Sequence, residues 1–123
     1  MKKQVHGLPR LKNATGYSIK GLKAAFKHES AFREEVVLAV FMIPGAFFLS
    51  NELSMQLLLV GVVVLVLITE LLNSAVEAAI DRIGEERHEL SGRAKDIGSA
   101  AVFLALLFAA LVWGMALWNF FSD

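Results

Sequence analysis

One face of a helix in segment 69–82 gathers three carboxylates and an amide. At 100° per residue, the four side chains fall on the same side of the helix. They are Glu70, Asn73, Glu77 and Asp81, called here the acidic stripe. The apolar segment 53–68 runs directly into segment 69–82, and no Gly or Pro separates the two. Because acidic residues at the end of a membrane helix are costly, we interpret the acidic stripe as a functional site.

Carboxylates one or two turns apart can form a proton relay, a Mg²⁺ site, or a general base beside a metal ligand. Glu70 and Glu77 would lie about 10 Å apart along the helix axis, too far to share one metal, so we expect different roles. At the membrane interface Glu70 could accept a proton from a lipid hydroxyl, while Glu77 could hold Mg²⁺ on a phosphate. With Lys95 to bind the phosphates, the pattern predicts phosphoryl transfer from a soluble donor to a lipid alcohol. The alternative is a purely structural stripe that forms hydrogen bonds between helices.

The composition indicates a membrane protein. Hydrophobic residues make up 56% of the 123 residues, and the mean hydropathy is +0.58, both higher than is usual for a soluble domain of this size. The length allows one domain, 1–123, and no second one. The absence of cysteine excludes disulfides and Cys-based metal sites.

The positive charges divide the chain into blocks that predict its topology. No Lys or Arg lies between residues 34 and 81 or after residue 95. The positive-inside rule then puts the N-terminus and the 81–96 loop in the cytoplasm, and the C-terminus outside. A soluble three-helix bundle is the alternative, but the apolar segment 97–121 lacks the charged face that it would need.

We therefore predict an all-α membrane protein with one surface helix and three spans. The expected elements are a surface helix at about 8–27 and spans at about 31–49, 53–83 with a cytoplasmic extension, and 93–121. The surface helix has an apolar stripe flanked by lysines, which suits the headgroup region of an anionic leaflet; an ordinary solvated helix packed on the protein is the alternative. The 53–83 helix would measure about 45 Å against a hydrocarbon layer of about 30 Å. Glu70 and Asn73 would thus lie near the cytoplasmic boundary, with Glu77 and Asp81 beyond it.

Four segments together resemble the bacterial integral-membrane diacylglycerol kinase family. They are residues 14–26, 29–35, 70–82 and 88–101, and they contain the specific motifs Glu-x-x-Asn-Ser-Ala-x-Glu-x-x-x-Asp and Lys-Asp-x-Gly-Ser-Ala. The resemblance covers essentially the whole chain. It implies a homotrimer in the bacterial inner membrane, whose active sites are shared between subunits and face the cytoplasm. The implied reaction is the ATP-dependent phosphorylation of the 3-hydroxyl of diacylglycerol to phosphatidic acid.

The resemblance also implies roles for individual residues. Glu70 would be the general base on the lipid hydroxyl with Asn73 supporting it, and Glu29 and Glu77 would hold Mg²⁺ on the nucleotide. The residues expected around ATP are Arg10, Tyr17, Glu29, Glu77, Glu86, Arg87, His88, Lys95 and Asp96. The residues expected around the lipid substrate are Arg10, Ala14, Tyr17, Ser18, Ala31, Arg33, Glu35, Phe48, Glu70, Ser99 and Trp113.

Three other functions compete with this interpretation. An undecaprenol kinase would have the same fold and a polyprenol acceptor. A small proton-coupled transporter would need four spans and a glutamate near mid-bilayer. A non-catalytic scaffold would need neither the Glu29 and Glu77 pair nor Lys95 and Asp96. No nucleic-acid motif is present, and the basic residues follow the predicted membrane boundaries. Asp81 is left without an assigned role, and a structural tie to Arg82 or the following loop is the simpler interpretation.

Overall fold

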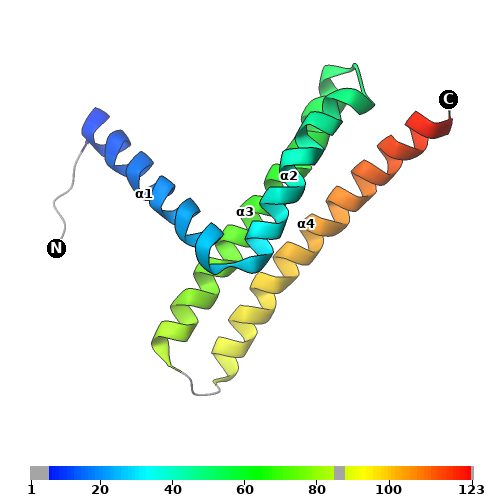
Figure 1. Ribbon diagram of the computed structural model, residues 1–123. Helices are drawn as coiled ribbons and strands as arrows, with labels where there is room; N and C mark the ends of the chain where they lie inside the picture. The colour runs from blue at the N-terminus through cyan, green and yellow to red at the C-terminus, as the bar shows by residue number, and fades with distance from the viewer. Residues whose placement is uncertain (1–5, 85–87, 123) are drawn as a thin grey trace.

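The computed structural model describes residues 6–84 and 88–122. Within these ranges the chain forms four α-helices and no strand, which confirms the all-α prediction for the described residues. The helices are α1 (Leu8–His28), α2 (Ser30–Leu49), α3 (Leu53–Ile83) and α4 (Glu89–Ser122). α3 packs against both α2 and α4, and α1 projects away from these three helices at its junction with α2 (Figure 1).

The junction between α1 and α2 sets the direction of α1. α1 begins after Gly7, whose φ of 75° is readily adopted only by glycine. It ends at His28, and Glu29 then takes an extended conformation with φ −113° and ψ 107°. The Arg33 guanidinium donates hydrogen bonds to the carbonyl oxygens of Phe26 and Lys27, at 2.7 and 3.3 Å. These bonds satisfy carbonyls at the C-terminal end of α1 and hold it against the start of α2.

The apolar core lies at the end of the bundle where residues 50–52 connect α2 to α3, called here the apolar end. Its buried residues come from all three bundle helices and are Ala46, Leu59, Val62, Val112 and Ala116. The Trp113 indole N–H donates a hydrogen bond to the Leu59 carbonyl oxygen at 3.1 Å, which links α4 to α3. Interhelical hydrogen bonds of this kind supplement side-chain packing where lipid surrounds a helix.

Among the described residues, α3 and α4 are long and apolar enough to cross a membrane. α2 is not apolar enough to join these two, because its first turns carry Arg33, Glu34 and Glu35. Large apolar side chains of the two long helices are widely exposed, among them Leu104 and Leu111 at 65% and 64%. Exposed apolar surface of this extent indicates contact with lipid or with other helices.

α4 begins at Glu89, four residues before the predicted start at about 93. The cap of α4 is His88, whose Nδ1 accepts a hydrogen bond from the Leu90 N–H at 3.1 Å. A capping acceptor two residues upstream of a free helical N–H stabilises the first turn. Lys95 and Asp96 consequently lie well inside the helix and not at its beginning.

Candidate active site

Among the residues that the structure describes, Glu70 is the buried charged residue, with 8% of its surface exposed. It lies on α3, between the apolar core and the end of the bundle where α3 ends and α4 begins. This end is called here the polar end. The carboxylates of Glu35, Glu77 and Glu29 are close enough to act on it electrostatically. Two of these groups belong to the start of α2 or its junction with α1, and one belongs to α3. This concentration of negative charge favours a cation or a proton donor at the site.

Asn73 and Glu77 form a side-chain pair one turn farther along α3. The Asn73 Nδ2 donates a hydrogen bond to Glu77 Oε1 at 3.3 Å, and both side chains are half-buried. The second amide atom, Oδ1, is buried and has no hydrogen-bond partner among the described residues. The hydrogen bond therefore fixes the Asn73 amide and the Glu77 carboxylate relative to each other.

Asp81 and Lys95 connect α3 to α4 at the polar end. Lys95 Nζ lies 3.1 Å from Asp81 Oδ1, with 43% of the lysine side chain and 70% of the aspartate side chain exposed. The sequence suggested a tie of Asp81 to Arg82 or the following loop, and the structure pairs it with Lys95 on the opposing helix. An ion pair this exposed contributes little to stability, so Lys95 can exchange Asp81 for another anion at low cost.

The site contains carboxylates but no closed metal cage. Within residues 6–84 and 88–122, no group of three or more His, Asp or Glu side chains is arranged to hold a metal ion. Glu29 and Glu77, the predicted ligands, are both half-buried near Glu70. Mg²⁺ typically takes one or two carboxylates and completes its shell with phosphate oxygens and water. The residues present fit a magnesium ion that is carried on a nucleotide.

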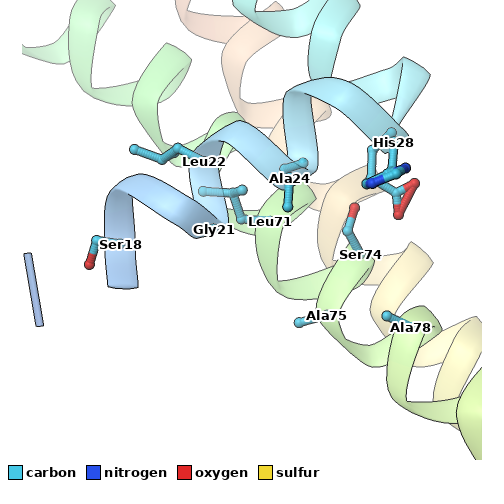
Figure 2. A pocket seen from close by; sticks show the side chains of 11 residues that line it. Ser18, Gly21, Leu22, Ala24, His28, Leu71, Ser74, Ala75 and Ala78 are labelled. Carbon is cyan, nitrogen blue, oxygen red and sulfur yellow. The ribbon is translucent and has the colours of Figure 1, made fainter. Parts of the chain in front are cut away.

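Two cavities adjoin the gathered carboxylates. The first, of about 570 Å³, lies between α1 and α3 and is lined by Ser18, His28 and Glu29 together with small or apolar residues. Figure 2 shows the crossing of the two helices there, with His28 of α1 and Ser74 of α3 among the side chains that line the cavity. The second, called here the three-helix cavity, has about 250 Å³ and lies between α2, α3 and α4. It runs from Glu35 to Trp113 along apolar side chains.

The other predicted site residues are spread along the molecule. Arg10, Ala14, Tyr17 and Ser18 are exposed on α1, and the Ser18 hydroxyl donates a hydrogen bond to the Ala14 carbonyl oxygen at 2.9 Å. Exposed positions on α2 and α4 are Ala31, Arg33, Asp96 and Ser99. Phe48 lies at the apolar end, 76% exposed, with its ring centroid 5.7 Å from that of Phe120. Glu86 and Arg87 lie outside the described residues, and His88 caps α4.

Comparison with known proteins gives the same family along almost the whole chain. The profile of the prokaryotic diacylglycerol kinase family matches residues 16–117. A protein of Haemophilus influenzae named diacylglycerol kinase is 57% identical over 108 residues, which cover 88% of this chain and 92% of that protein. Diacylglycerol kinases of Escherichia coli K12 and Pseudomonas aeruginosa are 49% and 51% identical, over 94% and 90% of this chain and 95% and 90% of their own lengths.

The chain belongs to the prokaryotic diacylglycerol kinase family. Membership confirms the family that the motifs of the acidic stripe and of segment 95–100 indicated. Because this is a family of kinases, the transporter and scaffold alternatives lose their support. Together with the two apolar helices α3 and α4, membership identifies a membrane protein.

Two residues of this family member's site were missed by sequence reasoning. Asp81 had no role and pairs with Lys95, and Gly98 was seen only as part of a motif although it lies directly against Asn73. The sequence did contain a signal that these residues of α3 and α4 lie opposite each other. Helices joined by a short connection run antiparallel, so residues at similar distances from segment 84–88 must lie opposite each other.

Proposed function

We propose that this chain is a diacylglycerol kinase that transfers the γ-phosphoryl group of ATP to the 3-hydroxyl of diacylglycerol at the cytoplasmic face of the bacterial inner membrane. The observation that carries the proposal is the buried Glu70 beside the Asn73–Glu77 pair, on a helix whose other half is apolar. That position lets one glutamate reach a lipid hydroxyl while the next turns of α3 reach a soluble nucleotide. Family membership supports both substrates.

Glu70 acts as the general base. As the hydroxyl oxygen of the lipid bonds to the γ-phosphorus, the bond from that phosphorus to the β-phosphate oxygen breaks, and the hydroxyl proton passes to Glu70. The products are phosphatidic acid and ADP. Burial of Glu70 keeps water from competing with the lipid hydroxyl for the phosphoryl group.

Glu29 and Glu77 would hold Mg²⁺ on the nucleotide, and the ion would neutralise charge on the phosphates. Asn73 orients Glu77 through the 3.3 Å hydrogen bond. Lys95 binds the phosphates, and its weak, exposed pair with Asp81 is the contact that the phosphates replace. Arg10, Tyr17, Glu86, Arg87, His88 and Asp96 complete the ATP site.

The acyl chains of the lipid occupy the apolar space beside Glu70. The three-helix cavity begins at Glu35 and is walled by apolar side chains as far as Trp113. Because the Trp113 indole N–H is already donated to Leu59, the tryptophan contributes its apolar ring to that wall. Ala14, Ser18, Ala31, Arg33, Phe48 and Ser99 complete the lipid surface.

Three copies of the chain form the enzyme, each with three spans (α2, α3 and α4) and with α1 lying on the membrane surface. Two observations support this arrangement: the large apolar side chains of α1 are exposed, as are many of α3 and α4, and the carboxylates of one chain make no closed metal site among its described residues. The N-terminus and segment 84–88 face the cytoplasm, and the C-terminus faces the periplasm, in accordance with the positive-inside rule.

The test is a phosphoryl-transfer assay with the purified protein in mixed micelles. Mg·ATP labelled in its γ-phosphate is supplied with diacylglycerol in one arm and undecaprenol in the other. We expect label in phosphatidic acid and at most a trace in undecaprenyl phosphate. Transfer to undecaprenol without transfer to diacylglycerol would replace the proposed acceptor, and no Mg-dependent transfer in either arm would overturn the proposal.

A further inference from the structure

Gly98 of α4 lies directly against the side chain of Asn73 in α3. A Cβ atom at position 98 would overlap Asn73 Oδ1 and would lie 3.3 Å from the Asn73 Cγ. Real Cβ atoms essentially never come as close to another atom as that overlap requires. The amide can therefore keep its present place only if residue 98 has no side chain.

The Asn73 amide has little freedom to move away. Its Nδ2 donates to Glu77 Oε1 at 3.3 Å, so a rotation of the amide by half a turn would bring two oxygens together. Its Oδ1 is buried against α4 without a hydrogen-bond partner among the described residues. Asn73 is thus fixed between the α4 backbone on one side and the carboxylate of Glu77 on the other.

We propose that Gly98 is a positioning residue for phosphoryl transfer: by leaving space for Asn73 against α4, it holds the amide that orients the Glu77 carboxylate. The proposal rests on the proposed function for the role of Glu77 toward Mg²⁺, but its structural part does not. A methyl group at position 98 displaces the amide and breaks its bond to Glu77. The effect should appear as a higher magnesium requirement and not as a weaker affinity for the lipid.

The chain offers a matched control on the same helix. Gly114 also belongs to α4, and a Cβ atom there would meet nothing within 4 Å. Gly114→Ala changes the same helix by the same methyl group without touching Asn73. Any general effect of replacing a glycine in α4 is therefore measured by this variant.

The first test compares the kinetics of Gly98→Ala, Gly114→Ala, Asn73→Ala and the double variant Asn73→Ala/Gly98→Ala in mixed micelles. For Gly98→Ala we expect kcat/KM for Mg·ATP to fall about 10- to 100-fold, the usual loss when a group that orients a metal ligand is removed, with KM for diacylglycerol unchanged. Gly114→Ala should match the wild type, and adding Gly98→Ala to Asn73→Ala should cost nothing more. Equal activity of the two glycine variants, or a further loss in the double variant, would overturn the proposal.

The second test does not depend on activity. Thermal unfolding of the same four proteins should show that Gly98→Ala lowers Tm when Asn73 is present. It should leave Tm unchanged or raise it when residue 73 is alanine, because the overlap has then been removed and alanine favours a helix over glycine. If the wild type transfers no phosphate but this reversal is seen, the proposed function fails and the Gly98–Asn73 contact stands.

If the Gly98→Ala variant does not assemble at all, the double variant still tests the proposal. The proposal requires Asn73→Ala/Gly98→Ala to assemble as the Asn73→Ala variant does, measured by size-exclusion chromatography and far-UV circular dichroism. Failure of the double variant where Asn73→Ala alone assembles would show that Gly98 acts through something other than Asn73, and would overturn the proposal.

Discussion

At the apolar end of the bundle, α3 and α4 meet through Leu59, Val62 and Val112, all of them buried. At the polar end, the same two helices meet through the Asp81–Lys95 ion pair and the contact of Asn73 with Gly98. One end is apolar and close-packed, with a hydrogen bond from Trp113. The other end has exposed charges, a buried glutamate and an amide oxygen without a partner among the described residues.

The contrast suggests a division between stability and chemistry along one pair of helices. Packing contributes most where apolar atoms are removed from contact with the surroundings and fill the space between helices. Exposed ion pairs contribute little, and a buried carboxylate costs free energy unless it has a partner. The polar end is therefore maintained by the rigidity of the apolar end, and it is free to bind ligands. Four substitutions test this division.

The largest expected effect is at Glu70. Glu70→Gln removes the proposed general base while keeping size and shape, and we expect kcat to fall about 10²- to 10⁴-fold. Because a neutral amide costs less to bury than a carboxylate, Tm should stay the same or rise. Both are measured on purified protein in mixed micelles. The control is Glu52→Gln, an exposed glutamate at the apolar end; near-normal turnover of Glu70→Gln would mean that the base is another group.

The next effect is at the apolar end and concerns stability. Leu59 is completely buried, so Leu59→Ala should lower the free energy of unfolding by about 2–5 kcal/mol, with kcat per folded enzyme unchanged. The exposed Leu57 on the same helix provides the control Leu57→Ala. Denaturant unfolding and activity at low temperature are the measurements. A loss of kcat without a loss of stability would contradict the division between the two ends.

A smaller effect is expected at Glu77. Glu77→Gln keeps the hydrogen-bonding partner of Asn73 but removes the charge proposed to hold Mg²⁺, so kcat/KM for Mg·ATP should fall about 10- to 100-fold. Titration with Mg²⁺ at fixed ATP should show that excess magnesium restores part of the rate. KM for diacylglycerol should not change. A variant that needs no more magnesium than the wild type would remove Glu77 from the metal site.

The smallest effect is expected at Asp81. Asp81→Asn breaks the pair with Lys95, which is 3.1 Å long but exposed, and such pairs contribute about 0–1 kcal/mol. Tm should therefore change little, while the released Lys95 should bind ATP as well as before or slightly better. Glu89→Gln breaks the exposed pair with Arg93 at 3.4 Å and is the matched control. A large loss of activity confined to Asp81→Asn would show that Asp81 itself contacts the nucleotide.

Much of the fold could be predicted from local patterns. The spacing of Glu70, Asn73 and Glu77 placed them on one helical face, and the structure has all three on α3, with the latter two hydrogen-bonded. The start of α4 could not be predicted in the same way. Its cap is His88, and the sequence offers stronger cap signals a few residues later.

The sequence by itself determined the helices, the apolar segments and the acidic stripe, because these depend on the order of residues within one helix and on its period. Only the tertiary structure decided that Glu70 is buried, that Lys95 pairs with Asp81, and that Gly98 touches Asn73. These facts depend on how far α3 and α4 are rotated and shifted against each other. That register is set by the fit of side chains at the apolar end, and no local pattern contains it.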